Sequence, residues 1–208
     1  MIDAMDLVTE TLLPRYQKRS THHRPFIVGI DGLGGAGKTT FAKALKNKLK
    51  QKTTILHLDD YIVEKRRRYG TGEEEWYEYY ALQWDIGTLQ SSLFQKLHHT
   101  LDVTLPFYDS FSDMIIKKDF IYDQNTIVLI EGVFLQRKEW RDFFDYVIFL
   151  DCTHEQRTER VIGRDLYLGD EKERVAKYER RYWKAEDHYL LHDDPIGRAD
   201  HIVKVPKG

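Results

Sequence analysis

Five short apolar runs lie along the chain, and stretches with helical spacing separate them. The runs are FIVGI (26–30), TTILHL (53–58), TIVLI (126–130), YVIFL (146–150) and HIVKV (201–205). Between the first two, residues 40–50 place Phe41, Leu45 and Leu49 on one helix face. Continuous apolar runs that alternate with helices are typical of a parallel sheet whose two faces are both covered. The pattern therefore predicts an α/β fold with helices on both faces of the sheet.

Other segments fall outside this alternation. Residues 2–13 predict a short amphipathic helix that ends near Pro14. The basic stretch 15–24 is interpreted as a solvated lead-in, with a nucleic-acid patch as the alternative. Residues 66–85 predict a long loop that leads into a helix beginning near Asp85.

The segment 103–119 predicts a hairpin, because Pro106 and the turn DSFSD separate two β-prone pieces. Long loops in compact α/β domains are usually either functional or disordered. Both this segment and the loop 66–85 are rich in aromatic residues, which argues against disorder. We therefore expect both to serve the function of the protein.

The composition limits the class of protein. Of the 208 residues, 41% are apolar, which is enough for one substantial core. Lys and Arg number 32 against 34 Asp and Glu, so no global field favours nucleic acid or an anionic membrane. Cys152 is the single cysteine, the N-terminus lacks a secretory pattern, and no apolar run reaches the roughly 18 residues that span a bilayer. We expect a soluble cytoplasmic protein that binds neither nucleic acid nor membrane.

A glycine-rich turn joins the first apolar run to the first helix. It consists of Gly32, Leu33, Gly34, Gly35, Ala36, Gly37, Lys38 and Thr39, with Thr40 next in the chain. This is the pattern G-x-x-x-x-G-K-[ST] between a strand and a helix, as the phosphate-binding P-loop requires. Small residues let backbone N–H groups form a nest around phosphate, and the helix N-terminus adds its positive end. Lys38 is expected to bridge the β- and γ-phosphates and Thr39 to bind Mg²⁺, so the turn predicts an ATP site.

The same glycines also fit a dinucleotide site. Gly32, Gly34 and Gly37 spell G-x-G-x-x-G, and Asp59 follows at roughly the distance of a ribose-binding acid. Lys38 decides against this alternative, since the dinucleotide site needs no lysine there. The chain is also too short for that fold together with a catalytic domain.

Acidic residues end two of the predicted strands. Asp59 and Asp60 follow the second run, at the rim where open parallel sheets bind ligands. Asp59 is the preferred base for an attacking hydroxyl, and a turn or helix N-cap is the alternative for both residues. Glu131 follows the run 126–130, which would put a carboxylate near Thr39 and the metal; a chance acid at a strand end is the alternative.

A basic helix is predicted over 155–183. Arg157, Arg160 and Arg164 are spaced by three and four residues and so share one helical face. On a closing lid, such arginines neutralise charge on a transferred phosphoryl group. Neighbouring acidic residues leave plain surface ion pairing as the alternative. Arg164 and Arg160 are the candidates for a catalytic role.

From about Pro25 to the C-terminus, several blocks resemble the uridine/cytidine kinase family of P-loop kinases. The blocks are FIVGIDGLGGAGKTT, HLDDYI, WDIGTLQSSL, LPFYDSFSD, IVLIEGVF, RVIGRD and ADHIVKVPKG. The resemblance implies the P-loop NTPase fold with a five-stranded parallel sheet, ATP, Mg²⁺ and phosphate transfer to a primary hydroxyl. It implies Asp59 as the base, a lid that carries Arg164, and an acceptor pocket. The acceptor-binding residues expected from the hairpin and the neighbouring blocks are Asp59, Tyr61, Asp85, Tyr108, Asp113 and Glu131.

Two positions depart from the family pattern. The hairpin of the family continues as Y-D-x-x-T-H, with a histidine that contacts the pyrimidine, whereas this chain has Asp113 there. An R-G-R-D run that follows the lid is replaced by YLGDEKER. An aspartate prefers a donor or a cation on the ligand. The identity of the acceptor therefore stays open at this point.

We predict one P-loop kinase domain over 1–208, with an N-terminal helix and lead-in (1–24), acceptor-binding insertions (62–119) and a lid with its following helix (153–190). The expected reaction is phosphorylation of a small-molecule hydroxyl by Mg·ATP. A nucleoside is the first candidate acceptor, with nicotinamide riboside, pantothenate or a sugar acid as alternatives. An ATP-dependent switch or hydrolase and an RNA-binding module are the alternatives of other classes. A homo-oligomer is left open, and His57 and the other histidines are interpreted as surface or packing residues.

Overall fold

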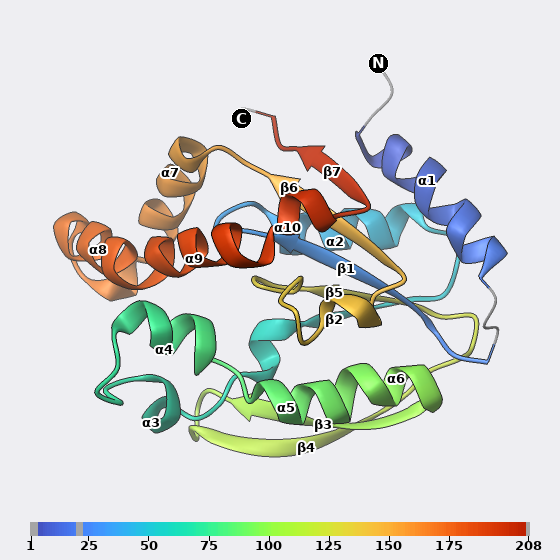
Figure 1. The fold of residues 1–208 in the computed structure, drawn as a ribbon, viewed down its shortest axis with the longest axis horizontal. Coiled ribbons are helices and arrows are strands. Elements are labelled where there is room, and N and C mark those ends of the chain that lie inside the picture. Colours follow the sequence, from blue (N-terminus) through green and yellow to red (C-terminus); the bar gives the residue numbers. More distant parts are fainter. Residues whose placement is uncertain (1–3, 20–22, 207–208) are drawn as a thin grey trace.

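The computed structural model describes residues 4–19 and 23–206, and a five-stranded sheet lies at its centre (Figure 1). The strands are β1 (Phe26–Gly32), β2 (Thr53–His57), β5 (Ile127–Glu131), β6 (Tyr146–Asp151) and β7 (His201–Lys204). Their spatial order is β2-β5-β1-β6-β7, and each neighbouring pair is parallel. The predicted five-stranded parallel sheet is confirmed.

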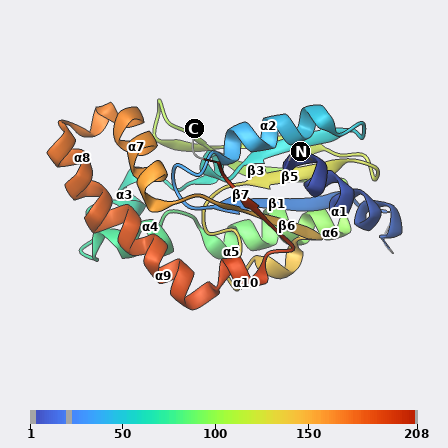
Figure 2. The same cartoon turned by 90° about the horizontal axis from the view of Figure 1, so that it is seen from above.

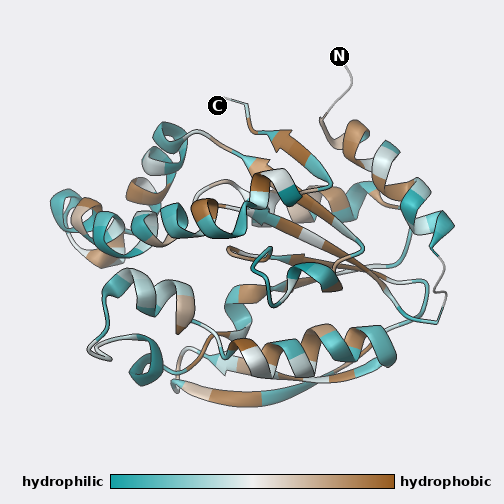
Figure 3. Ribbon diagram, in the orientation of Figure 1, coloured by the Kyte–Doolittle hydropathy of each residue, from teal (hydrophilic) through white to brown (hydrophobic). Residues whose placement is uncertain are grey.

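Helices α1 (Ala4–Lys18) and α2 (Lys38–Lys48) cover one face of the sheet, where they pack on Val28 and Leu129. Figure 3 shows the central strands as apolar over most of their length. Strands buried on both sides have this character because neither row of side chains meets water.

Helix α1 does not end near Pro14, so that prediction is wrong. The helix includes Pro14 and continues to Lys18. Contacts with distant parts of the chain hold its last turn, since the Tyr16 ring packs edge-on against Phe26 with ring centroids 5.7 Å apart. A proline costs a helix one hydrogen bond, and such packing can offset that loss.

The solvated lead-in predicted for 15–24 needs correction. Residues 15–18 belong to α1, and residues 20–22 lie outside the described residues. Arg24 is buried and its guanidinium pairs with the Asp145 carboxylate at 2.7 Å. The positive charge of Arg24 therefore anchors the start of β1 instead of facing solvent.

Between β2 and β5 the chain inserts several helices and a hairpin. The helices are η1 (Leu58–Tyr61), α3 (Lys65–Arg68), α4 (Glu75–Ala81), α5 (Ile86–Leu89), η2 (Gln90–Phe94) and α6 (Gln95–His99). The long loop predicted for 66–85 is wrong, because it contains α3 and α4. Glu78 of α4 makes a buried ion pair with Arg181, a contact across the sequence that no local pattern reveals. The helix predicted to begin near Asp85 is confirmed, and Asp85 caps it by accepting the Thr88 N–H.

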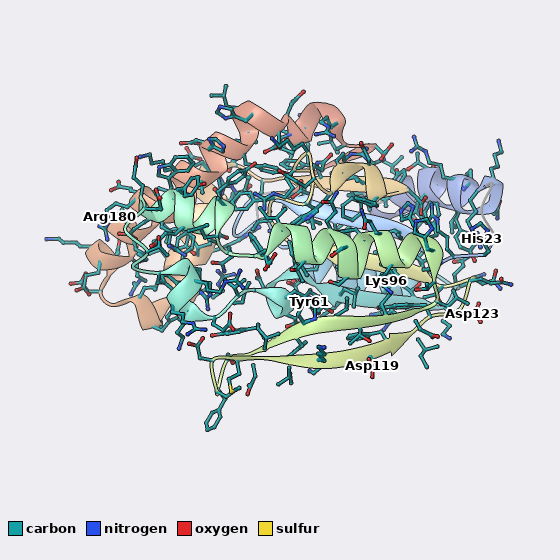
Figure 4. The ribbon with its side chains drawn as sticks, turned by 60° about the horizontal axis from the view of Figure 1, so that its bottom comes forward. His23, Tyr61, Lys96, Asp119, Asp123 and Arg180 are labelled. Carbon is teal, nitrogen blue, oxygen red and sulfur yellow. The ribbon has the colours of Figure 1, made fainter. Side chains whose placement is uncertain are left out.

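The predicted hairpin is confirmed as β3 (Asp102–Asp109) and β4 (Met114–Ile121), which pair antiparallel. It forms a two-stranded sheet separate from the main one and runs beneath α5 and α6 (Figure 1). Leu105 of β3 is fully buried, whereas Ile121 of β4 is exposed. Figure 4 shows Tyr61 above the hairpin, where its ring packs edge-on against a hairpin phenylalanine.

A series of helices, here called the helical arm, connects β6 to β7. It comprises α7 (His154–Arg164), η4 (Leu166–Leu168), α8 (Glu171–Lys177), η5 (Tyr178–Trp183) and α9 (Lys184–Asp193), and α10 (Pro195–Arg198) follows. The single basic helix predicted over 155–183 is wrong, because the chain turns between Asp165 and Asp170. Asp165 accepts hydrogen bonds from Arg164 and Tyr178, and Asp170 begins α8 with a capping box. Figures 1 and 2 show the arm beside α3 and α4, at the carboxyl ends of the main strands.

The second face of the main sheet packs against α5, η2, α6, the hairpin and α9. Ile27 and Val128 of the sheet share one core with Leu93 of η2, Leu105 of the hairpin and Tyr189 of α9. The short turn η3 (Arg141–Phe143) lies beside this core. Within 4–19 and 23–206, the helices are too short or too polar to cross a membrane.

Candidate active site

The P-loop leaves β1 at Gly32 and enters α2 at Lys38. Gly35 (φ 80°) and Gly37 (φ 91°) have left-handed backbone conformations that side chains disfavour, and these let the loop curl. Lys38 Nζ donates to the carbonyl oxygens of Gly32 at 2.8 Å and Leu33 at 3.0 Å. The loop therefore combines a cation with the positive end of a helix, which is the arrangement that binds phosphate.

A cavity of about 250 Å³ opens beside the P-loop. Its walls are Gly34, Gly35, Gly37, Lys38, Thr39, Thr40, Asp59, Tyr79, Glu131, Val133 and Arg164. The cavity thus brings together the P-loop, the ends of β2 and β5, helix α4 and the helical arm. Tyr79 and Val133 were not predicted as site residues. Tyr79 belongs to no motif, and in the block IVLIEGVF, which contains Val133, a role was assigned to Glu131 alone. The run of aromatic residues on α4 was the only signal for Tyr79.

Asp59 and Lys38 line this cavity with opposite charges and shifted pKa values. The Asp59 carboxylate faces the cavity, where solvent reaches it, and many protein atoms surround its other sides. This burial raises the pKa of Asp59, whereas the positive charges of Lys38 and Arg164 lower it. Burial likewise lowers the pKa of Lys38. Shifts of this kind are common at catalytic sites. Asp59 lines the cavity, whereas Asp60 is not among its walls.

Glu131 connects the P-loop to the neighbouring strand. Thr39 Oγ1 donates to Glu131 Oε1 at 2.9 Å, and His57 Nδ1 lies 2.6 Å from the same oxygen. The parallel register of β2 and β5 places His57 opposite Glu131. The interpretation of His57 as a surface or packing residue therefore needs correction. Its position at the end of a predicted strand, level with a strand-end acid, was the available signal.

The residues around Thr39 suit a magnesium ion. Mg²⁺ prefers hydroxyl, carboxylate, water and phosphate oxygens, and in phosphoryl-transfer enzymes one or two carboxylates complete its shell. Thr39, Glu131 and Asp59 present such oxygens in one cavity. The hydrogen bond from Thr39 Oγ1 to Glu131 Oε1 keeps two of these oxygens 2.9 Å apart.

The three arginines of α7 reach toward the P-loop, but their surroundings differ. Arg164 lines the cavity. Arg160 Nη1 donates to the Gly35 carbonyl at 3.3 Å. Arg157 is buried and pairs with Glu186 of α9, which the sequence analysis did not consider as its partner. Of the three, Arg164 is the one whose side chain lines the cavity beside the P-loop.

A larger cavity of about 460 Å³ adjoins the first, and Gly37 and Thr40 line both. Its other walls are Ala4, Met5, Ala36, Phe41, Ala44, Leu150, Arg160 and residues 203–206. A mostly apolar hollow with a few polar groups is typical of a site for a flat organic ring. No local sequence pattern predicts this cavity, because separate segments of the chain build its walls.

Two predicted acceptor residues lie away from Lys38. Tyr61 and Asp85 line a separate pocket of about 180 Å³ between η1, α3, α5 and the hairpin. Asp85 pairs there with Arg67, with an N–O distance of 3.1 Å. The structure therefore does not bring these two residues to the cavity beside the P-loop.

Tyr108 and Asp113 contact each other in the hairpin. Tyr108 Oη donates to Asp113 Oδ1 at 2.9 Å, and the Lys65 N–H donates to the same oxygen at 3.0 Å. The Lys65 N–H holds the pKa of Asp113 below its usual value, and the Tyr108 hydroxyl assists. Asp113 also has a left-handed backbone (φ 55°), which aspartate tolerates better than most residues. Protein groups thus engage Asp113 at the turn of the hairpin.

The fold and the cavity together define a phosphotransferase of the P-loop class. The phosphate loop lies at the carboxyl edge of a parallel sheet, and a carboxylate and an arginine stand beside it. The family within this class follows from comparison with known proteins.

The model of the phosphoribulokinase/uridine kinase family matches residues 27–204. A solved structure from Bacillus stearothermophilus, described as a possible uridine kinase, is 41% identical with a TM-score of 0.79, over 96% of this chain and 97% of that one. The uridine kinase of Streptococcus agalactiae serotype III is 29% identical over 190 residues, which cover 89% of this chain and 88% of the relative. D-glycerate 3-kinase from Cryptococcus neoformans shares the fold, with 11% identity and a TM-score of 0.63 over 97% of this chain and 96% of its own.

The chain belongs to the phosphoribulokinase/uridine kinase family. It is an ATP-dependent kinase that phosphorylates a small molecule. The predicted P-loop kinase class is confirmed, and the dinucleotide-binding alternative is excluded.

Proposed function

We propose that this kinase transfers the γ-phosphate of Mg·ATP to a hydroxyl group of a nucleoside. The observation that carries the proposal is the meeting of Asp59, Lys38 and Arg164 in one cavity beside the P-loop. The similarity to proteins named uridine kinase supports a nucleoside as the acceptor.

Each group of the cavity has a role in this proposal. The P-loop N–H groups and Lys38 hold the phosphates of ATP. Asp59 orients the acceptor hydroxyl and takes its proton as the oxygen attacks phosphorus. Arg164 neutralises charge on the transferred phosphoryl group, and Arg160 supports the loop through the Gly35 carbonyl. The apolar cavity of about 460 Å³ receives the base of ATP.

Thr39 and Glu131 would hold Mg²⁺. The ion, when bound, spreads the negative charge of the β- and γ-phosphates. His57 Nδ1 lies 2.6 Å from Glu131 Oε1. This contact fixes the orientation of the Glu131 carboxylate, including that of its second oxygen, Oε2.

The acceptor side consists of the insertions over 62–119, and the helical arm within 153–190 acts as the lid. Asp85, Tyr108 and Asp113 belong to those insertions, and Tyr61 directly precedes them. Tyr61 and Asp85 line a pocket separate from the Lys38 cavity, and Tyr108 and Asp113 contact each other in the hairpin. Movement of the insertions toward the P-loop would bring the acceptor to Asp59. Such closure on substrate binding is common among kinases.

A second candidate acceptor follows from the charge on Asp113. The carboxylate stays ionised, since the Lys65 N–H lowers its pKa. An anion where uridine kinases carry a histidine favours an acceptor with a cationic or donor-rich ring, such as nicotinamide riboside.

The test is ADP release from Mg·ATP by the purified protein with uridine, cytidine, nicotinamide riboside, pantothenate and glycerate. Turnover with uridine or cytidine that Asp59→Asn abolishes would support the nucleoside proposal. Turnover with nicotinamide riboside alone would favour the second candidate. Turnover only with pantothenate or glycerate would contradict both.

A further inference from the structure

Two residues of the helical arm hold Gly34 of the P-loop. The Gly34 N–H donates to Glu186 Oε1 at 2.7 Å, and the Gly34 carbonyl accepts from Arg157 Nη1 at 3.2 Å. Arg157 Nη1 also donates to Glu186 Oε2 at 2.7 Å, so the three residues form a closed set of contacts. The two side chains are only 7% and 4% exposed. The peptide groups on both sides of Gly34 are therefore fixed by buried charges.

The loop has little room to move within these contacts. A Cβ atom at Gly34 would lie 3.0 Å from Glu186 Oε1. At Gly35, a Cβ would lie 2.9 Å from both the Arg157 carbonyl oxygen and Val161 Cγ1. Helix α7 thus packs with its backbone directly on the P-loop.

Helix α9 contacts the same region a second time, one turn beyond Glu186. Tyr189 Oη donates to Asp31 Oδ2 at 2.6 Å, and Asp31 Oδ1 accepts the Gly32 N–H at 2.8 Å. Asp31 and Tyr189 are fully buried. Helix α9 therefore holds the P-loop both at its start and at Gly34.

We propose that Arg157 and Glu186 are positioning residues that keep the P-loop in the shape that receives the phosphates of the nucleotide. This inference rests on the proposed function, because it requires the loop to bind ATP. Both side chains act through the backbone of Gly34, which lines the cavity. A buried ion pair seldom stabilises a fold more than apolar side chains of the same size. We therefore expect this ion pair to fix the orientation of the P-loop backbone rather than to increase the stability of the fold.

The combination Arg157→Met with Glu186→Leu removes both contacts to Gly34 and fills their volume with apolar side chains. ADP affinity is measured by titration calorimetry on the full chain with MgCl₂ present. We expect the Kd for ADP to rise about tenfold, since charge-assisted hydrogen bonds that orient the loop are lost. The melting temperature of the ligand-free protein should change little, since apolar replacements of a buried pair are often neutral.

A second buried ion pair, which has one residue on the same arm, provides a matched control. Arg181 and Glu78 form a buried pair, 0% and 4% exposed and 3.0 Å apart, that joins η5 to α4. Arg181→Met with Glu78→Leu makes the same chemical change away from the P-loop, and the Kd for ADP should stay within about twofold. Glu186→Gln is the conservative variant, because its amide oxygen still accepts the Gly34 N–H. It should raise the Kd less than the double change does.

The outcomes separate the inference from the proposed function. If the wild-type protein phosphorylates an acceptor and the Arg157/Glu186 double variant binds ADP equally tightly, the inference is overturned and the proposed function stands. An equal loss of affinity in the control pair overturns the inference as well, since loosening of the arm would explain both. If the double variant fails to fold, an unchanged Kd in Glu186→Gln overturns it. A wild-type protein that does not bind ADP overturns the inference and the proposed function together.

Discussion

Tyr108 Oη and Asp113 Oδ1 lie 2.9 Å apart at the turn of the hairpin, and the backbone of Lys65 binds the same oxygen. The contact ties the turn to strand β3 and to the start of α3. Position 113 therefore shapes the acceptor side without touching the P-loop.

Asp113→Ala should raise the KM for the acceptor about tenfold and leave the KM for ATP unchanged, because it removes two hydrogen bonds from the acceptor side alone. Steady-state kinetics with each substrate varied in turn measures both constants. Asp109→Ala is the control, since the Asp109 carboxylate accepts hydrogen bonds from Ser112 and Phe111 within the same turn. An equal rise in the KM for ATP would contradict the separation of the two sides.

Asp59→Asn should lower kcat by about a thousandfold, since removal of a general base typically costs two to four orders of magnitude. Asp60→Asn is the matched control, because Asp60 is the neighbouring carboxylate but is not among the residues that line the cavity with Lys38. We expect Asp60→Asn to retain most of the activity. Rapid-quench measurement of a single turnover isolates the chemical step, and a comparable loss in Asp60→Asn would move the base to that residue.

The pH dependence of the protein should carry the signature of Asp59. Burial raises the pKa of its carboxyl, and only the ionised form can accept a proton, so kcat/KM should fall as pH falls through the raised pKa. Stability should change in the opposite direction. The folded protein binds this proton more tightly than the unfolded chain, so the contribution of Asp59 to stability is full below the unfolded pKa and is lost as pH rises through the folded one.

Asp59→Asn cannot ionise and should therefore become more stable than the wild type as pH rises, with no difference in strong acid. Melting curves of both proteins between about pH 4 and about pH 8 measure this difference. A melting difference that does not vary with pH would show that the carboxyl titrates normally in the folded protein.

Thr39→Val should lower kcat about a hundredfold and raise the Mg²⁺ concentration needed for half-maximal rate, because it removes a hydroxyl ligand and releases Glu131. Thr39→Ser keeps the hydroxyl and should restore most of the rate. Removal of Mg²⁺ with a chelator should abolish turnover in all three proteins. A Thr39→Val enzyme with unchanged Mg²⁺ dependence would remove Thr39 from the metal site.

The main sheet and the phosphate loop could be predicted because their signals are local. Each buried strand appears as a continuous apolar run, and the loop has fixed spacing between Gly32 and Lys38. Parallel strands also place their carboxyl ends at one edge, which is why Asp59 and Glu131 could be expected near the loop.

What could not be predicted depends on contacts between distant segments. Helix α1 continues past Pro14 because Tyr16 packs on Phe26. Helix α4 forms within an expected loop because Glu78 meets Arg181. The partner of Arg157 is Glu186 of α9, which lies 29 residues further along the chain. Neither charge pattern nor periodicity indicates which residues on separate helices will meet.

The hairpin and the main sheet form separate hydrogen-bonded ladders, and side chains such as Val103 and Leu105 pack in the core that both share. In the proposed function, the main sheet with its P-loop binds ATP and the hairpin helps to select the acceptor, so the two tasks belong to separate structural units. A hairpin from another kinase could replace residues 102–121 without disturbing strand register, provided that it keeps the apolar side chains that pack on the core, such as Val103 and Leu105. New acceptor specificity can thus be engineered, or evolve, on a catalytic frame that stays constant.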